Sequence, residues 1–157
     1  MKKSTKITTA SLAGAAIVAT GAIIAFNIIN NNAPFRLDDE YYAASEYIDI
    51  NKDEYEQLIS NKKTFIVMID KPGCITTPAM RENMANFPDD MQFKYYRIIW
   101  DDVKESSLHE YVKFTPSVAI IRKGEVKAWL QADRDEDTKY FNDGEALKEW
   151  IKKYILF

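Results

Sequence analysis

The stretch TFIVMIDKPGCITTPAM, residues 64–80, decides the fold of this chain. Its first part, Thr64–Ile69, is an apolar run without polar alternation, which is typical of a strand covered on both faces. The only cysteine of the chain, Cys74, follows shortly after. A helix that buries Met80 and Met84 is expected next. The sequence therefore predicts a thiol between the tip of a buried strand and the N-terminus of a helix.

Further strands and helices alternate around this stretch. The expected strands are Tyr47–Ile50, Phe93–Trp100, Val118–Ile121 and Val126–Leu130. The expected helices are one capped by Asn51 with Glu54, one around Val103–Val112, and an amphipathic one over Leu147–Ile155 capped by Asn142. This order predicts an α/β domain over residues 47–157, with a central mixed sheet flanked by helices.

The first residues have the pattern of a membrane element. No charged residue occurs from Ile7 to Phe35, and Ile7–Ile29 is mostly apolar and long enough to cross about 30 Å of hydrocarbon. Three lysines precede this run, which predicts a cytoplasmic tip (1–6), a transmembrane helix (7–29), a polar linker (30–46) and an exported domain. A cleaved signal peptide is the alternative, although small-x-small sites such as Ala13–Ala15 fall inside the apolar run.

The charge distribution limits the classes of partner. All 24 acidic residues and 18 of the 21 basic residues lie in residues 34–157, so this part of the chain is acidic. An acidic domain is a poor match for the phosphate backbone of a nucleic acid. Membrane lipid is expected to contact the chain through the N-terminal helix.

Three features in the right order resemble the thioredoxin family. The motif GCITTP, Gly73–Pro78, occupies the place of the Cys-x-x-Cys motif of that family. Thr115-Pro116 occupies the place of its cis-proline loop, and Ile120–Val126 is similar to the hairpin that follows. The resemblance implies a thioredoxin-like fold over residues 47–157, preceded by the single transmembrane helix.

The same resemblance implies roles for individual residues. Cys74 would be the nucleophile, assisted by Thr77, and the substrate would lie against Gly73, Ile75 and the loop Thr115-Pro116. The peptide bond between Thr115 and Pro116 is expected to be cis, and proline is the residue for which the cis form is affordable.

The chain departs from the family pattern at three positions. Thr77 replaces the second, resolving cysteine, so the sequence resembles a monothiol Cys-x-x-Thr variant. Gly73 replaces the usual tryptophan, and Met68 stands where a buried acid is expected, so a proton acceptor is predicted to be missing. Small membrane-anchored thioredoxin-like proteins of Gram-positive bacteria, including bacteriocin transport accessory proteins, have a similar layout.

The chemistry of a lone thiol follows from its position. Free N–H groups at a helix N-terminus favour a thiolate, and we expect Lys71 and the Thr77 hydroxyl to favour it further. One cysteine cannot store an internal disulfide, so net dithiol transfer is excluded. The chain could form mixed disulfides with exported clients or a membrane redox partner, or isomerise clients. The alternative is a non-catalytic binding module that accompanies an export or cell-surface system.

Other candidate sites are weaker. His109 is the only histidine and is expected on a solvated helix rather than as the base of a Cys-His pair. Asp133–Asp137 has the beginning of a calcium loop, but Thr138 and Gly144 replace its glycine and its bidentate glutamate. We therefore expect neither a metal site nor a cofactor.

The lysines before the apolar run generate a test of orientation. Protease added to intact cells should remove residues 34–157 while leaving a membrane-embedded fragment, because the basic end is retained in the cytoplasm. Immunoblotting with an antibody against the C-terminal domain measures this. A domain that is protected until the membrane is broken would contradict the orientation, and a freely secreted domain would contradict the anchor.

Overall fold

The computed structural model describes residues 33–157. The chain divides into two units, and the second, Pro34–Phe157, is described below. The predicted cytoplasmic tip, the transmembrane helix and the first residues of the linker lie outside the described residues. Within residues 33–157, no helix combines the length and the apolar character needed to cross a membrane.

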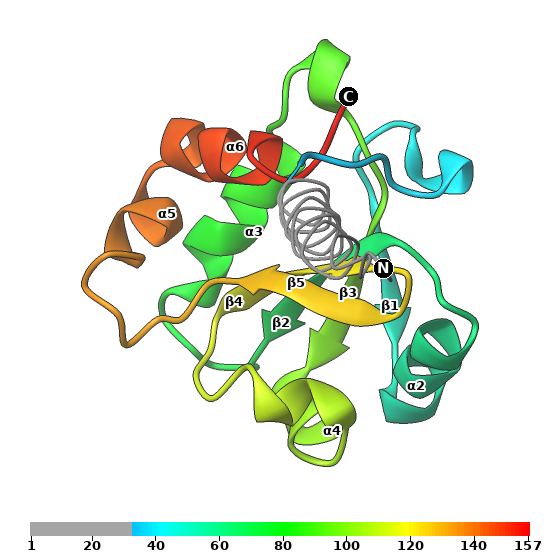
Figure 1. The fold of residues 1–157 in the computed structure, drawn as a ribbon. Coiled ribbons are helices and arrows are strands. Elements are labelled where there is room, and N and C mark those ends of the chain that lie inside the picture. The colour runs from blue at the N-terminus through cyan, green and yellow to red at the C-terminus, as the bar shows by residue number, and fades with distance from the viewer. Residues whose placement is uncertain (1–32) are drawn as a thin grey trace, which may run out of the picture. The chain divides into compact units, whose positions relative to one another are not determined.

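A mixed sheet of five strands forms the centre of the domain (Figure 1). The strands are β1 (Tyr47–Ile50), β2 (Phe65–Asp70), β3 (Tyr95–Ile99), β4 (Ser117–Arg122) and β5 (Glu125–Trp129). Their spatial order is β1-β3-β2-β4-β5, in which β3 runs parallel to β1 and β2, and β4 runs antiparallel to β2 and β5. Every residue of β2 is buried, as its unbroken apolar pattern predicts.

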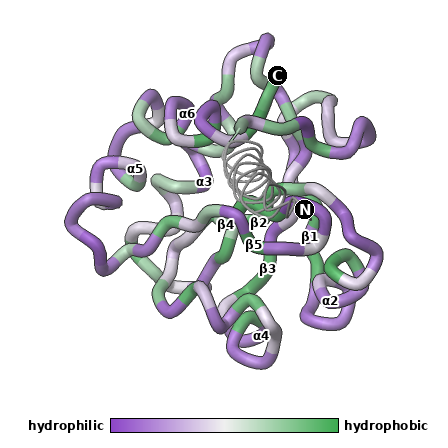
Figure 2. Tube along the Cα trace, in the orientation of Figure 1, coloured by the Kyte–Doolittle hydropathy of each residue, from purple (hydrophilic) through white to green (hydrophobic). Residues whose placement is uncertain are grey.

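Helices cover both faces of this sheet (Figure 1). They are α2 (Lys52–Ser60), α3 (Thr77–Ala85), α4 (Trp100–Lys104), α5 (Thr138–Asn142) and α6 (Gly144–Lys152), with short 3₁₀ turns η1 (Asp39–Tyr41), η2 (Asp89–Met91) and η3 (Ser107–Glu110). Helices α3, α5 and α6 contact one another on one side, and α2 and α4 lie on the other. Figure 2 shows β2 as hydrophobic along most of its length, whereas β5 mixes hydrophobic and hydrophilic residues and the connecting loops are mostly hydrophilic.

Local sequence signals explain two connections. Asn51 and Glu54 form the predicted capping box at the start of α2, with the Asn51 side chain accepting from the Glu54 N–H at 3.0 Å. The β4–β5 hairpin turns through Lys123 and Gly124, which both have positive φ, as a two-residue hairpin loop requires. A Cβ at Gly124 would lie 2.3 Å from the Ile59 carbonyl oxygen, so only glycine fits there.

Two predicted helices differ from those observed. The helix expected around Val103–Val112 is instead α4 followed by η3, and the break lies at Ser106, whose hydroxyl donates to the Val103 carbonyl. The cap of α6 is Asp143 rather than Asn142, because the Asp143 carboxylate accepts from the backbone N–H groups of Glu145 and Ala146.

The segment predicted as a polar linker is partly folded, which corrects its boundary. Phe35, Leu37 and Tyr41 are buried in the core. The backbone of Phe35 bonds to both Tyr154 and Leu156, and the Asp38 N–H donates to the carbonyl of Thr64. Burial of the apolar side chains in this segment offsets the conformational entropy that is lost when the segment is ordered. The compact unit accordingly begins at Pro34.

Replacing Leu37 distinguishes a folded segment from a linker. Leu37→Ala should lower the free energy of unfolding by about 2–4 kcal/mol, because it removes a buried side chain from the core. Urea unfolding followed by tryptophan fluorescence measures the change. Leu156→Ala is the matched control at a side chain that is 48% exposed, and an equal, small effect of both substitutions would show that the segment does not contribute to the fold.

Candidate functional site

A tight turn joins the end of β2 to the cysteine. The Cys74 N–H donates to the Lys71 carbonyl at 3.1 Å, and Gly73 between them has φ +79°. Proline followed by glycine with positive φ is the signature of a type II turn, which explains Pro72-Gly73. A Cβ at Gly73 would meet no atom within 4 Å, so glycine is required there by its φ rather than by lack of space.

Cys74 is a free, half-buried thiol two residues before the cap of α3. The Thr76 hydroxyl lies 3.2 Å from the Cys74 sulfur and donates to it when the thiol is ionised. This hydrogen bond is the main reason that the pKa of Cys74 lies below its ordinary value. The backbone N–H groups of Thr76 and Thr77 and the hydroxyl of Thr77 act in the same direction, and partial burial opposes them.

Thr77 occupies a different environment from the one expected. Its side chain is 2% exposed, and its Oγ1 has no hydrogen-bond partner of ordinary geometry among the described residues. The hydroxyl at hydrogen-bond distance from the sulfur is that of Thr76, at 3.2 Å, and the Thr77 hydroxyl makes a smaller contribution to the lowered pKa of Cys74. Thr76 is exposed at the surface, whereas Thr77 faces the interior at the first position of α3.

Cys74 opens into a groove of about 490 Å³, here named the Cys74 groove. Its lining residues are Lys71, Pro72, Gly73, Cys74, Ile75, Trp100, Lys113, Phe114 and Thr115. Four of the predicted site residues, Gly73, Cys74, Ile75 and Thr115, thus share one surface. Ile75 is 93% exposed beside the cysteine, an unusual position for a large apolar side chain.

The proline loop closes one side of this groove. The Thr115-Pro116 peptide bond is cis, which confirms the prediction for this linkage. Pro116 itself is buried, and Thr115 lines the Cys74 groove. The next residue, Ser117, begins β4 and donates its hydroxyl to the Leu130 carbonyl at 2.5 Å, which holds the loop to the end of the hairpin.

Asp70 corrects the prediction that this end of the sheet lacks a buried acid. Its side chain is 2% exposed at the last residue of β2, four positions before the cysteine. Its Oδ2 accepts from the Arg81 guanidinium, and the Arg97 guanidinium lies 3.7 Å away. Its Oδ1 is buried and has no partner among the described residues. Met68, where the acid was expected, is fully buried in the core.

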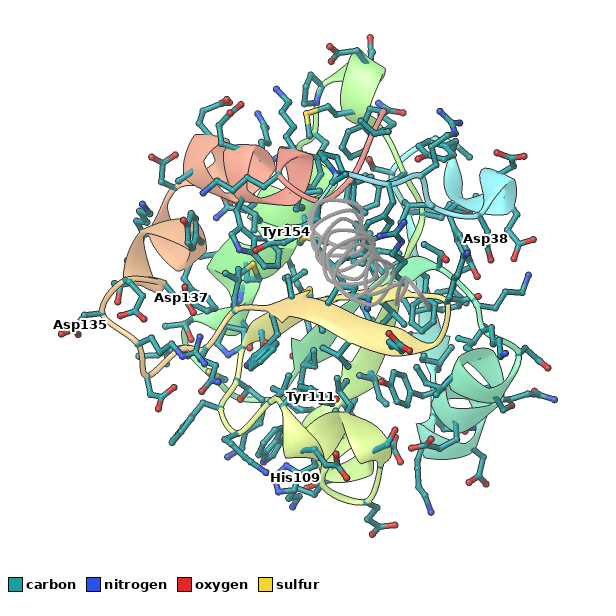
Figure 3. All side chains as sticks on the ribbon, in the orientation of Figure 1. Asp38, His109, Tyr111, Asp135, Asp137 and Tyr154 are labelled. Atoms are coloured by element: carbon teal, nitrogen blue, oxygen red, sulfur yellow. The ribbon has the colours of Figure 1, made fainter. Side chains whose placement is uncertain are left out.

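The weaker candidate residues have structural partners. His109 Nδ1 lies 3.2 Å from the Val112 carbonyl oxygen, and its ring meets the edge of Trp100. Figure 3 shows Asp137 directed toward the domain and Asp135 directed outward. The Asp137 carboxylate accepts from the Gln131 N–H at 2.9 Å. Among residues 33–157, no three His, Cys, Asp or Glu side chains form a group that could hold a metal ion.

Sequence reasoning missed several residues of the site. Trp100, Lys113 and Phe114 line the groove, although the sequence predicts Trp100 only as the end of a strand and assigns no role to Lys113 or Phe114. Phe114 directly precedes the predicted proline loop, and this adjacency was a usable signal. Nothing in the local pattern indicates that Trp100 lines the same groove as the cysteine, since this placement depends on the parallel pairing of β2 with β3.

Comparison with known proteins supports the fold. No model of a known protein family matches this chain, and no curated protein sequence matches it. Among solved structures, Trxlp from Edwardsiella tarda is 10% identical with a TM-score of 0.50 and covers 68% of this chain and 98% of its own. Thioredoxin f from spinach chloroplast is 14% identical with a TM-score of 0.49, and the match covers 74% of this chain and 96% of the spinach protein.

A thioredoxin from Schistosoma mansoni is 14% identical, with a TM-score of 0.47, and covers 72% of this chain and 100% of its own. At such identities, the likeness concerns the fold and not the activity. The described domain therefore has a thioredoxin-like α/β fold, with a mixed five-stranded sheet flanked by helices.

Replacement of the two threonines tests the origin of the low cysteine pKa. Thr76→Val should raise the pKa of Cys74, because it removes the hydroxyl that donates to the thiolate. The rate of alkylation as a function of pH measures this pKa, and at neutral pH alkylation should become slower. Thr77→Val is the matched control and should raise the pKa less. An equal or larger effect of Thr77→Val would contradict the assignment to Thr76.

Proposed function

We propose that this chain is a thiol–disulfide exchange protein that forms mixed disulfides through Cys74 and has no resolving cysteine of its own. The single observation that carries the proposal is the position of the thiol. Cys74 lies in an open groove, at the start of α3, with a hydroxyl 3.2 Å from its sulfur and a pKa below the ordinary value. A thiolate in a partly exposed site is the form of cysteine that attacks disulfides.

The proposed step is a direct exchange between sulfurs. The Cys74 thiolate attacks one sulfur of a client disulfide, the client S–S bond breaks, and the other client sulfur leaves as a thiolate. A new S–S bond then joins Cys74 to the client. The number of disulfides is unchanged, so the step requires no additional oxidant or reductant.

Release of the client requires a thiol from outside this chain. Thr77 occupies the position of a resolving cysteine, but its hydroxyl cannot attack a disulfide, and no other cysteine is present. A thiolate of the client itself can attack the mixed disulfide, which rearranges the client's disulfides and regenerates Cys74. A separate thiol protein in the same membrane could perform the same release.

The proposed location follows from the N-terminal sequence. A single membrane helix at residues 7–29 would hold the domain outside the cytoplasm, where disulfides in client proteins persist. Exported proteins are then the clients, as the likeness to small anchored thioredoxin-like proteins of the bacterial cell envelope suggests.

A second candidate function is binding without chemistry. Ile75 and Phe114 are exposed beside the cysteine and could hold an extended segment of a partner regardless of the sulfur. In this case the chain is an accessory module of an export or surface system, and Cys74→Ala should leave partner binding intact.

Trapping of clients separates these two functions. When native membranes are solubilised after rapid thiol blocking, the full chain should migrate on non-reducing gels in covalent adducts that reductant dissolves. Wild-type chain should give these adducts, Cys74→Ala should give none, and Thr77→Cys should give fewer because it restores an attacking sulfur. Mass spectrometry of the adducts identifies the clients.

The controls decide which proposal fails. Cys74→Ser is a control of nearly the same size that cannot form a disulfide. If the wild-type chain forms no adducts, and Cys74→Ser captures the same non-covalent partners as wild type to the same extent, the exchange function is wrong and the binding module is favoured.

A further inference from the structure

The charge around Cys74 differs from that of the rest of the domain. Residues 34–157 are acidic overall, but the only charged side chains that line the Cys74 groove are Lys71 and Lys113. Both are exposed, and no carboxylate of the described residues lies within ion-pair distance of either. The groove is therefore a small positive region on an acidic domain.

Nearby groups leave this positive charge in place. The ammonium of Lys113 donates to the His109 carbonyl, which holds its charge beside Phe114 and Thr115. Lys104 chiefly, and Lys71 to a smaller extent, lower the pKa of Asp101, and the Asp101 carboxylate forms its ion pair with Lys104 at 2.6 Å. The buried acid Asp70 is engaged by arginines.

Large apolar side chains line the same groove as the two lysines. Ile75 is 93% exposed and Phe114 is 48% exposed, and Trp100 lines the same groove. Exposed apolar side chains of this size beside a reactive group indicate a surface that is covered when a partner binds. A partner that covers them brings its own chain within reach of both ammonium groups.

We infer that the Cys74 groove selects client segments that carry an apolar residue next to the reacting cysteine and carboxylates on either side of it. This inference rests on the proposed exchange function and specifies its substrate class. Lysine charges at the rim favour the encounter with an acidic segment and disfavour a basic one, and salt screens both effects. The apolar contact lowers the dissociation rate without discriminating charge.

Three activated peptides test the selectivity of the full 157-residue chain. Each has an apolar residue beside one cysteine that is disulfide-bonded to 2-thiopyridine, and the flanking residues are glutamate, glutamine or lysine. Attack by Cys74 breaks that disulfide, joins Cys74 to the peptide and releases the pyridinethiolate, which takes up a proton and is followed by its absorbance.

The acidic peptide should react about tenfold faster than the basic one at low salt, and this ratio should fall to about twofold near 0.5 M salt. In Lys71→Gln/Lys113→Gln the ratio should fall toward one. The ratio is unaffected by any change in the intrinsic reactivity of the thiol, because both peptides meet the same sulfur. Lys153→Gln, at an exposed lysine after α6, is the matched control and should keep the wild-type ratio.

Two different results would contradict the two proposals separately. Equal rates for the three wild-type reactions, or an unchanged ratio in the double variant, would overturn the charge selectivity while leaving the exchange function intact. No release from any peptide by the folded chain would overturn the exchange function, and the selectivity with it.

Discussion

The buried carboxylate of Asp70 is the constraint on which the cysteine end of the domain depends. It ends the central strand, and the arginines that neutralise it come from α3 and β3. Arg97 also makes two hydrogen bonds to Asp49 of the edge strand β1. A buried charge costs several kcal/mol unless it is paired, so these elements must meet at this point for the domain to fold. The turn to Cys74 begins at the very next residue.

A short segment after Asp70 places the thiol of Cys74 at the surface. The Pro72-Gly73 turn brings the sulfur to the surface, and the start of α3 supplies hydrogen-bond donors that favour the thiolate. The threonine at the place of a resolving cysteine is buried and unreactive. The geometry therefore fits the first half of the proposed disulfide exchange cycle, whose second half would depend on a thiol from elsewhere.

The sequence predicted correctly the elements whose formation depends on neighbouring residues in the chain. The unbroken apolar run predicted the central strand, and the capping box at Asn51 predicted the start of α2. The predictions were incomplete where a feature depends on contacts between residues far apart in the sequence. The partners of Asp70 lie on a helix and on another strand, which the local sequence around Asp70 does not indicate. Leu37 is buried only because its segment packs against the rest of the domain.

The reactivity of Cys74 in the folded chain, compared with the same thiol in the unfolded chain, tests the central claim most directly. A small neutral disulfide can be used at neutral pH, with and without denaturant. The lowered pKa raises the thiolate fraction more than it reduces the nucleophilicity of the sulfur, so the folded chain should react faster. A folded chain that reacts more slowly than the unfolded one would show that the fold shields this thiol, and would contradict the account.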